Sequence, residues 1–199
     1  MTTDLQPRLT SRQTNRRHVP GETGIWVFIL GDLLIFALFF VTFVVDRSQE
    51  TELFDSSRAE LHISWGALNT LLLLTGSLFV VWAVHAARDD KLREASRFTS
   101  WAMGCGVVFG VNKVVEYTDK ITSGHGPDSN IFFTYYFCFT GLHALHLVIA
   151  LCVLARMRWL LKQPDFGPED IGTLESAATY WHLVDLLWIV LFALLYLMT

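Results

Sequence analysis

Five long apolar blocks separated by short polar segments dominate the pattern of this chain. A helix needs about 20 residues to cross the hydrocarbon core of a bilayer, and each block supplies that length. No segment shows the sustained in-out alternation of a membrane β-barrel. We therefore predict an all-α membrane protein with five transmembrane helices in one bundle, at approximately residues 24–45, 63–87, 98–118, 131–155 and 176–199.

The third block is the weakest, because Lys113 and Glu116 fall inside it. The two residues are three positions apart, so they share a helix face and can form an ion pair. They also lie near the predicted outer end of the span, where a lysine stem can extend toward the lipid headgroups. We retain this block as a span on these two grounds.

Basic residues predict the orientation of the bundle, since Lys and Arg concentrate in cytoplasmic segments. The segment before the first span, the second-to-third connection and the fourth-to-fifth connection are basic, whereas the other two connections are poor in basic residues. The N-terminus is therefore expected in the cytoplasm and the C-terminus outside. Residues 1–22 form a polar leader that we expect to be flexible, and residues 23–199 form the bundle. The apolar stretch behind the leader is too long for a secretory signal.

Composition narrows the class of protein further. Charged residues make up 17% of the 199 positions, against roughly 25% in soluble domains. The connections are too short to hold an extramembrane domain, and no catalytic nucleophile motif or phosphate loop is present. The net charge of −4 argues against nucleic-acid binding. We expect a multi-pass membrane protein whose chemistry lies in or beside the bilayer.

The ionisable side chains inside the spans are the candidates for function, because such groups are costly in hydrocarbon. Asp32, in the first span, has three interpretations: a packing carboxyl bonded to a neighbouring helix, a contact for a lipid headgroup, or a proton-handling group. The cysteines have no metal-ligand spacing, and we expect them to be buried structural thiols; they are Cys105, Cys138 and Cys152.

Two polar pairs recur at one-turn spacing in the last two spans. His143 and His146 are three residues apart, as are His182 and Asp185, so each pair shares a helix face. Histidines on facing helices are typical of b-type cytochromes, which makes a haem-carrying membrane anchor an alternative. No clear second ligand lies at matching depth for an outer haem, and interhelical hydrogen bonds account for the same residues.

Five motifs in order carry a resemblance to a known family. The sequence resembles the cytochrome c oxidase subunit III family at the segments Glu175–Trp188 (ESAATYWHLVDLLW), Thr140–His146 (TGLHALH), Glu116-Tyr117, Leu68-Asn69-Thr70, and Asp32 followed by Phe36, Phe39 and Phe40. The resemblance covers residues 24–199 and the short, five-helix form of the family.

The resemblance implies an accessory subunit without a cofactor or catalytic residue of its own. Such subunits pack beside catalytic subunit I of a haem–copper oxidase, which carries the haem and copper. They also bind membrane phospholipid and support proton uptake and stability during turnover. Asp32 takes the place of the family's intramembrane acid, which is usually Glu. The places of its buried polar network are taken by Glu116, His143, His146, Glu175, His182 and Asp185. A five-helix chain with a polar leader also resembles the branch associated with nitric oxide reductases, which stays an alternative.

Overall fold

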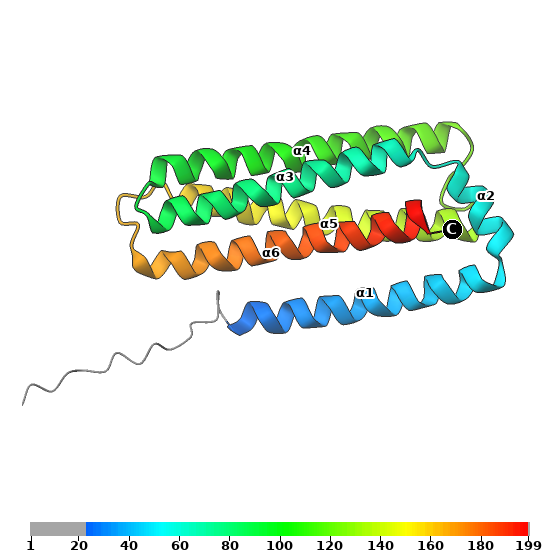
Figure 1. Ribbon diagram of the computed structural model, residues 1–199, viewed down its shortest axis with the longest axis horizontal. Helices are drawn as coiled ribbons and strands as arrows, with labels where there is room; N and C mark the ends of the chain where they lie inside the picture. The colour runs from blue at the N-terminus through cyan, green and yellow to red at the C-terminus, as the bar shows by residue number, and fades with distance from the viewer. Residues whose placement is uncertain (1–22, 199) are drawn as a thin grey trace, which may run out of the picture.

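The computed structural model describes residues 23–198, and within them it is helical, without a strand. The elements are α1 (Thr23–Gln49), α2 (Thr51–Ala59), α3 (Ile63–Arg88), α4 (Leu92–Thr122), α5 (Ile131–Leu160), α6 (Pro168–Phe192) and a π-helical turn, η1 (Ala193–Leu197) (Figure 1). Five of the helices are long and apolar enough to cross a membrane, which confirms the predicted all-α class with five spans. The predicted leader, residues 1–22, and the last residue of the fifth predicted span lie outside the described residues.

The helices extend beyond the apolar blocks, because capping signals rather than hydropathy set their ends. α6 begins at Pro168, whose fixed φ suits the first helical position, and the Asp170 carboxylate accepts the backbone N–H of Gly167 at 2.9 Å. α5 begins after Asn130, whose side chain accepts the Phe133 N–H at 2.9 Å. Beyond the end of α4, Gly124 takes a φ of +85°, a conformation that glycine adopts without steric cost.

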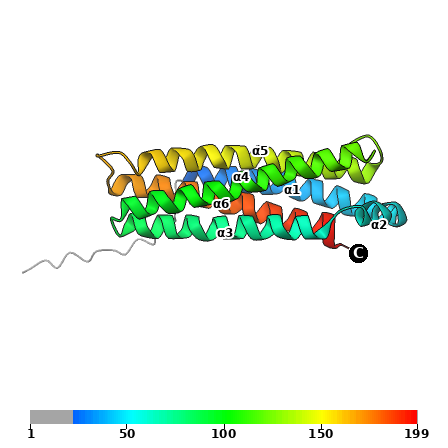
Figure 2. The same cartoon turned by 90° about the horizontal axis from the view of Figure 1, so that it is seen from above.

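Four helices form the body of the bundle, and the fifth lies at its edge. Figures 1 and 2 show α3, α4, α5 and α6 side by side, with α1 running along the side formed by α5 and α6. The short α2, which the hydropathy pattern does not predict, turns the chain at one end of the molecule and contacts α5. α6 is the most enclosed of the long helices and α1 the least.

Trp181 of α6 fills the centre of the seam between α3 and α4. A Cβ atom added to Gly76 would lie 2.9 Å from Trp181 Cζ2, and one added to Gly106 would lie 3.0 Å from Trp181 Cη2. The two glycines therefore make room for the indole ring, which is 1% exposed. Small residues at helix contacts let neighbouring backbones approach closely inside a membrane.

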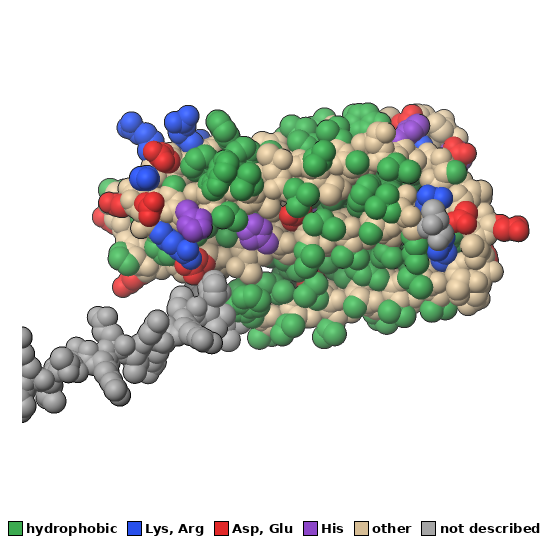
Figure 3. Space-filling view, viewed as in Figure 1, with side chains coloured by type: hydrophobic (Ala, Val, Ile, Leu, Met, Phe, Trp, Pro, Cys, Tyr) green, Lys and Arg blue, Asp and Glu red, His purple; other side chains and the backbone are tan. Residues whose placement is uncertain are grey.

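The outer surface matches a membrane-embedded molecule. Hydrophobic side chains cover the middle of the face in Figure 3, and charged side chains gather at its two ends. α1 exposes a row of large aliphatic side chains, including Val27, Leu34 and Leu38. Cys138 and Cys152 are also exposed, and Cys105 is half-buried. The expectation of buried thiols is therefore wrong for Cys138 and Cys152, because both occupy exposed positions of α5.

The Trp181 seam predicts opposite effects for two glycine substitutions. Gly76→Ala places a methyl group against the indole and is expected to destabilise the chain by about 1–3 kcal/mol. Gly104→Ala is the matched control on the facing helix, because nothing lies within 4 Å of its added Cβ; it should leave stability unchanged or raise it by about 0.5–1 kcal/mol. Thermal unfolding in detergent measures both, and an equal melting temperature for the two variants would contradict the seam.

Candidate functional site

Asp32 on α1 and His146 on α5 form a hydrogen-bonded pair across the edge of the bundle. Asp32 Oδ1 lies 3.0 Å from His146 Nε2, and the two side chains are 11% and 10% exposed. His146 Nδ1 lies 2.8 Å from the Leu142 carbonyl oxygen. Since a carbonyl only accepts, Nδ1 carries a hydrogen, and the contact between Nε2 and Asp32 needs a second one. The pair therefore holds one shared proton, as carboxylate with imidazolium or as carboxylic acid with imidazole.

A second polar contact ties α1 to α5 toward the other end of the helix. The Tyr135 hydroxyl donates to Asp46 Oδ2 at 2.5 Å. Between the two polar contacts, Phe36 packs edge-on against the His146 ring, and Phe43 packs against Tyr135, with ring centroids 5.5 Å apart in both cases. α1 is thus fastened to the bundle by aromatic contacts between two hydrogen-bonded points.

An apolar groove lies beside the first of these points. It has a volume of about 440 Å³ and lies between α1, α5 and α6, at the end where α1 begins. This volume falls in the range of small-ligand sites. Among residues 23–198, Arg156 is the one charged residue in its lining, which includes Ile25, Phe28, Ile149, Val153 and Tyr180. The groove therefore combines a long apolar wall with one cation at the end of a membrane span.

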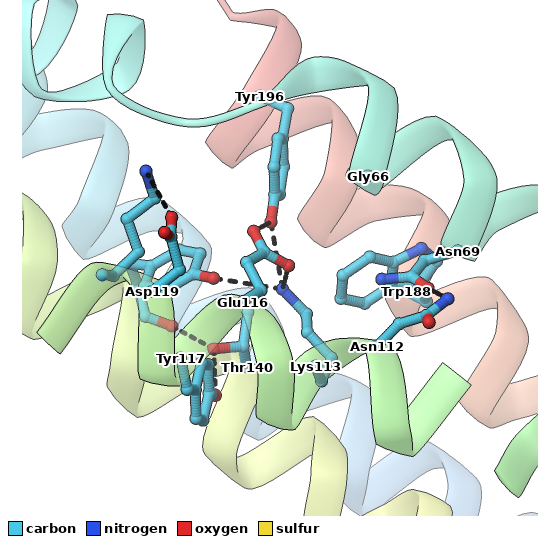
Figure 4. Close-up of polar contacts among 12 residues, drawn as sticks. Gly66, Asn69, Asn112, Lys113, Glu116, Tyr117, Asp119, Thr140, Trp188 and Tyr196 are labelled. Atoms are coloured by element: carbon cyan, nitrogen blue, oxygen red, sulfur yellow. Dashed lines mark hydrogen bonds and ion pairs between the residues drawn. The ribbon is translucent and has the colours of Figure 1, made fainter. Parts of the chain in front are cut away.

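Lys113 and Glu116 form an ion pair that is buried in the bundle (Figure 4). Lys113 Nζ donates to Glu116 Oε2 at 2.9 Å, to the Tyr136 hydroxyl at 3.2 Å and to the Tyr196 hydroxyl at 3.0 Å. The Tyr196 hydroxyl in turn donates to Glu116 Oε1 at 2.5 Å. The predicted pairing is confirmed. The expectation that Lys113 extends to the headgroups is wrong, because it finds three oxygen acceptors inside the bundle and is 5% exposed.

Aromatic rings complete the enclosure of this lysine. Lys113 Nζ lies 4.9 Å from the Trp188 ring centroid and 5.0 Å from that of Tyr136, within range of a cation–π attraction. Tyr196 reaches the pair from η1, the π-helical end of the chain. The wider turn of η1 therefore places a donor over Glu116.

Ser77, His182 and Asp185 form a third cluster, between α3 and α6. The Ser77 hydroxyl donates to Asp185 Oδ2 at 2.7 Å, and His182 Nδ1 lies 3.1 Å from Ser77 Oγ. Because the one hydroxyl proton is directed at Asp185, Ser77 accepts from His182 Nδ1–H. Nearer the charged end of the same two helices, Arg88 Nη2 pairs with Glu175 Oε1 at 2.7 Å.

His143 stands apart from these clusters. It is fully buried, with its ring centroid 5.5 Å from that of Phe109 and 5.2 Å from that of Trp188. Neither ring nitrogen has a hydrogen-bond partner among residues 23–198. The structure thus pairs His146 with Asp32, joins His182 to Asp185 through Ser77, and places the remaining expected residues in separate groups: Glu116, His143 and Glu175.

Several members of these clusters carry no signal in the sequence. Three of them lie on helices other than those of the residues they bond, so no spacing along the sequence predicts these contacts. They are Ser77, Tyr136 and Tyr196. Asn69, the middle residue of the Leu68-Asn69-Thr70 motif, pairs with Asn112, whose Nδ2 donates to Asn69 Oδ1 at 3.1 Å. Only the packing of α3 against α4 reveals that partner.

The buried Lys113 pair predicts a large loss of stability on removal of one partner. Lys113→Met leaves Glu116 without its cation and should destabilise the chain by about 3–5 kcal/mol, whereas Lys113→Met with Glu116→Leu should recover most of that loss. Lys91→Met is the matched control, because Lys91 is exposed and forms a long ion pair of 3.8 Å with Asp89. Exposed pairs contribute about 0–1 kcal/mol to stability. Thermal unfolding in detergent distinguishes them, and equal losses at the two lysines would contradict this interpretation.

Comparison with known proteins supplies the family. The family model described as Cytochrome c oxidase subunit III matches residues 13–199. The chain is 28% identical to the Cytochrome c oxidase subunit 3 of Thermostichus vulcanus over 88% of this chain and 86% of that protein. It is 25% identical to the Cytochrome bo(3) ubiquinol oxidase subunit 3 of Buchnera aphidicola over 87% and 84% of the two chains.

A third relative widens the range of oxidases represented. The Quinol oxidase subunit 3 of Bacillus subtilis is 25% identical over 88% of this chain and 85% of its own length. The relatives thus include subunits named for cytochrome c oxidases and for quinol oxidases. With five apolar helices and a family match over nearly its whole length, this multi-pass membrane protein belongs to the cytochrome c oxidase subunit III family.

Proposed function

We propose that this chain is a cofactor-free accessory subunit III of a haem–copper respiratory oxidase and that it packs on catalytic subunit I. The observation that carries the proposal is the family match over residues 13–199. The haem and copper belong to the partner subunit in this proposal. The oxidase names of the relatives favour an oxidase over a nitric oxide reductase as the partner.

The surroundings of the histidines support a role without haem. His146 uses both ring nitrogens, on Asp32 and the Leu142 carbonyl, and His182 uses Nδ1 on Ser77. His143 packs against the rings of Phe109 and Trp188, whose centroids lie 5.5 Å and 5.2 Å from its own. Axial ligation needs an imidazole nitrogen that faces the iron across an open space for the porphyrin, and His143 and His146 offer no such space. The haem-anchor alternative therefore has little support.

The groove between α1, α5 and α6 supports a lipid-binding role. Its lining is apolar and suits an acyl chain, and Arg156 lies where it could pair with a phosphate. The Asp32–His146 pair links α1 to α5 deeper in the membrane than this groove. In this proposal the pair holds α1 at the distance that a bound phospholipid requires, and its shared proton makes Asp32 the candidate for a proton-related role.

We propose that the end of the bundle where α3 and α5 end and where α4 and α6 begin faces the cytoplasm. This end carries seven basic residues, whereas the opposite end carries few, in accordance with the preference of Lys and Arg for cytoplasmic segments. The seven are Arg88, Lys91, Arg93, Arg97, Arg156, Arg158 and Lys162. A bacterial inner membrane is the expected location.

Purification from native membranes tests the proposed partner. A tagged chain should recover a haem–copper catalytic subunit, and the chain purified alone should show no Soret band. Recovery of a nitric oxide reductase catalytic subunit instead would assign the other branch. A Soret band of the isolated chain that disappears in His143→Ala or His182→Ala would establish a haem anchor and defeat the proposal.

Substitution of Asp32 tests the role of the α1 groove. Asp32→Ala should leave the bundle folded, and it should lower the number of turnovers before inactivation and the phospholipid retained per protein after detergent exchange. Asp46→Asn is the matched control, since Asp46 also bonds an α5 side chain, at the far end of α1. Lipid content and sustained turnover that stay at the wild-type level in Asp32→Ala would remove Asp32 from the function.

A further inference from the structure

The seam between α3 and α6 contains a polar row that the proposed accessory role does not use. A groove of about 190 Å³ lies along this seam, and its lining includes His85, Arg88, Glu175, Ala178, Thr179 and His182. Figure 3 shows histidine, basic and acidic side chains near the charged end of this face. His182 belongs both to the lining of the groove and to the cluster with Ser77 and Asp185.

The hydrogen bonds of this row run in one direction. Ser77 accepts from His182 Nδ1–H at 3.1 Å and donates to Asp185 Oδ2 at 2.7 Å. With Nδ1 protonated in the neutral ring, His182 Nε2 is an acceptor. The row thus begins at a proton acceptor beside the groove and ends at a carboxylate that is 6% exposed.

The row reaches well into the membrane. Glu175 and Asp185 are ten residues apart on α6, which corresponds to about 15 Å along a helix, or roughly half of a 30 Å hydrocarbon core. Glu175 lies near the end of the bundle and pairs with Arg88, whose side chain is about half exposed. The row therefore joins the end of the bundle that holds Arg88 and Glu175 to the Asp185 carboxylate near mid-membrane.

The other ionisable groups around the row lie at the groove, pair with other side chains or are enclosed by aromatic rings. On α3, His85 and Arg88 face the groove itself. On α5, His146 pairs with Asp32, and His143 lies between aromatic rings. On α4, Cys105 lies beside Gly76, the residue before Ser77: a Cβ atom added to Gly76 would be 3.4 Å from Cys105 Cβ. The path from the groove to Asp185 thus passes through His182 and Ser77.

We propose that this row takes up a proton from the groove and stores it on Asp185, with His182 and Ser77 as the carriers. The incoming proton binds His182 Nε2, the Nδ1 proton moves to Ser77 Oγ, and the original Ser77 hydroxyl proton moves to Asp185 Oδ2. One proton and one carboxylate become one carboxylic acid, while His182 and Ser77 end neutral with their hydrogen bonds reversed. The reverse sequence returns the proton to the groove.

This inference goes beyond the proposed function, on which it rests only for the use of the proton by an oxidase. The row lies within one chain, so it can be tested on the purified full-length protein in lipid nanodiscs. Failure to recover a catalytic subunit would defeat the proposed function and leave the row untouched, and failure of the row would leave the accessory role standing.

Infrared spectroscopy follows the proton directly. In acidic buffer Asp185 should contribute a carboxylic C=O band that is lost in Asp185→Asn, and rapid mixing with D2O should shift this band as deuterium arrives. Ser77→Ala removes the carrier and should slow that shift at least tenfold, as should His182→Phe from the groove side. Ser77→Thr retains a hydroxyl and should restore the exchange rate to within about twofold of wild type.

Thr75→Ala is the matched control, because it also removes a hydroxyl from α3, one that donates to the Leu71 carbonyl on the exposed side of the helix. It should exchange at the wild-type rate. The proposal is overturned if Ser77→Ala or His182→Phe exchanges as fast as Thr75→Ala, or if no carboxylic band depends on Asp185. Equal helix content by circular dichroism separates slowed exchange from unfolding.

Discussion

The hydrocarbon core offers no water to a polar group, and this constraint accounts for most of the interior of the bundle. A polar group left without a partner there costs several kcal/mol, and buried groups such as Asp32, Glu116 and Asp185 find partners on other helices. Lys113 and Glu116 illustrate the result. Both are buried, and two tyrosine hydroxyls from α5 and η1 complete their hydrogen bonds.

The same constraint determines how the edge helix is attached. α1 is largely exposed and shares little of the tight packing that joins α3 to α4. Its polar contacts with α5, through Asp32 and Asp46, are therefore important for its position, and the apolar groove lies next to the first of them. In the proposed accessory role, these fixed points would hold α1 in place while the groove between α1, α5 and α6 stays open to a lipid.

The arrangement also divides the polar residues by task. The Lys113 pair and the Asn69–Asn112 pair lie between helices of the main body and hold them together. The Ser77 row borders a groove, and the Asp32 pair lies beside another. Clusters that border a groove can exchange protons or contact a ligand, whereas enclosed clusters can only stabilise the fold. The structure therefore separates polar clusters suited to function from those that hold the helices together.

The sequence alone determined the five spans, the helical class and the family, because hydropathy and short motifs are local properties of the chain. It also indicated the Lys113–Glu116 pair, since three-residue spacing is set by one helix. It did not reveal α2, because that helix is short and polar, nor the inward path of Lys113. Only the tertiary structure decided the interhelical partners of Asp32, Glu116 and Asp185, which are His146, Tyr196 and Ser77. They come from other helices, and the rotation and depth of one helix against another depend on packing, such as the fit of Trp181 between Gly76 and Gly106.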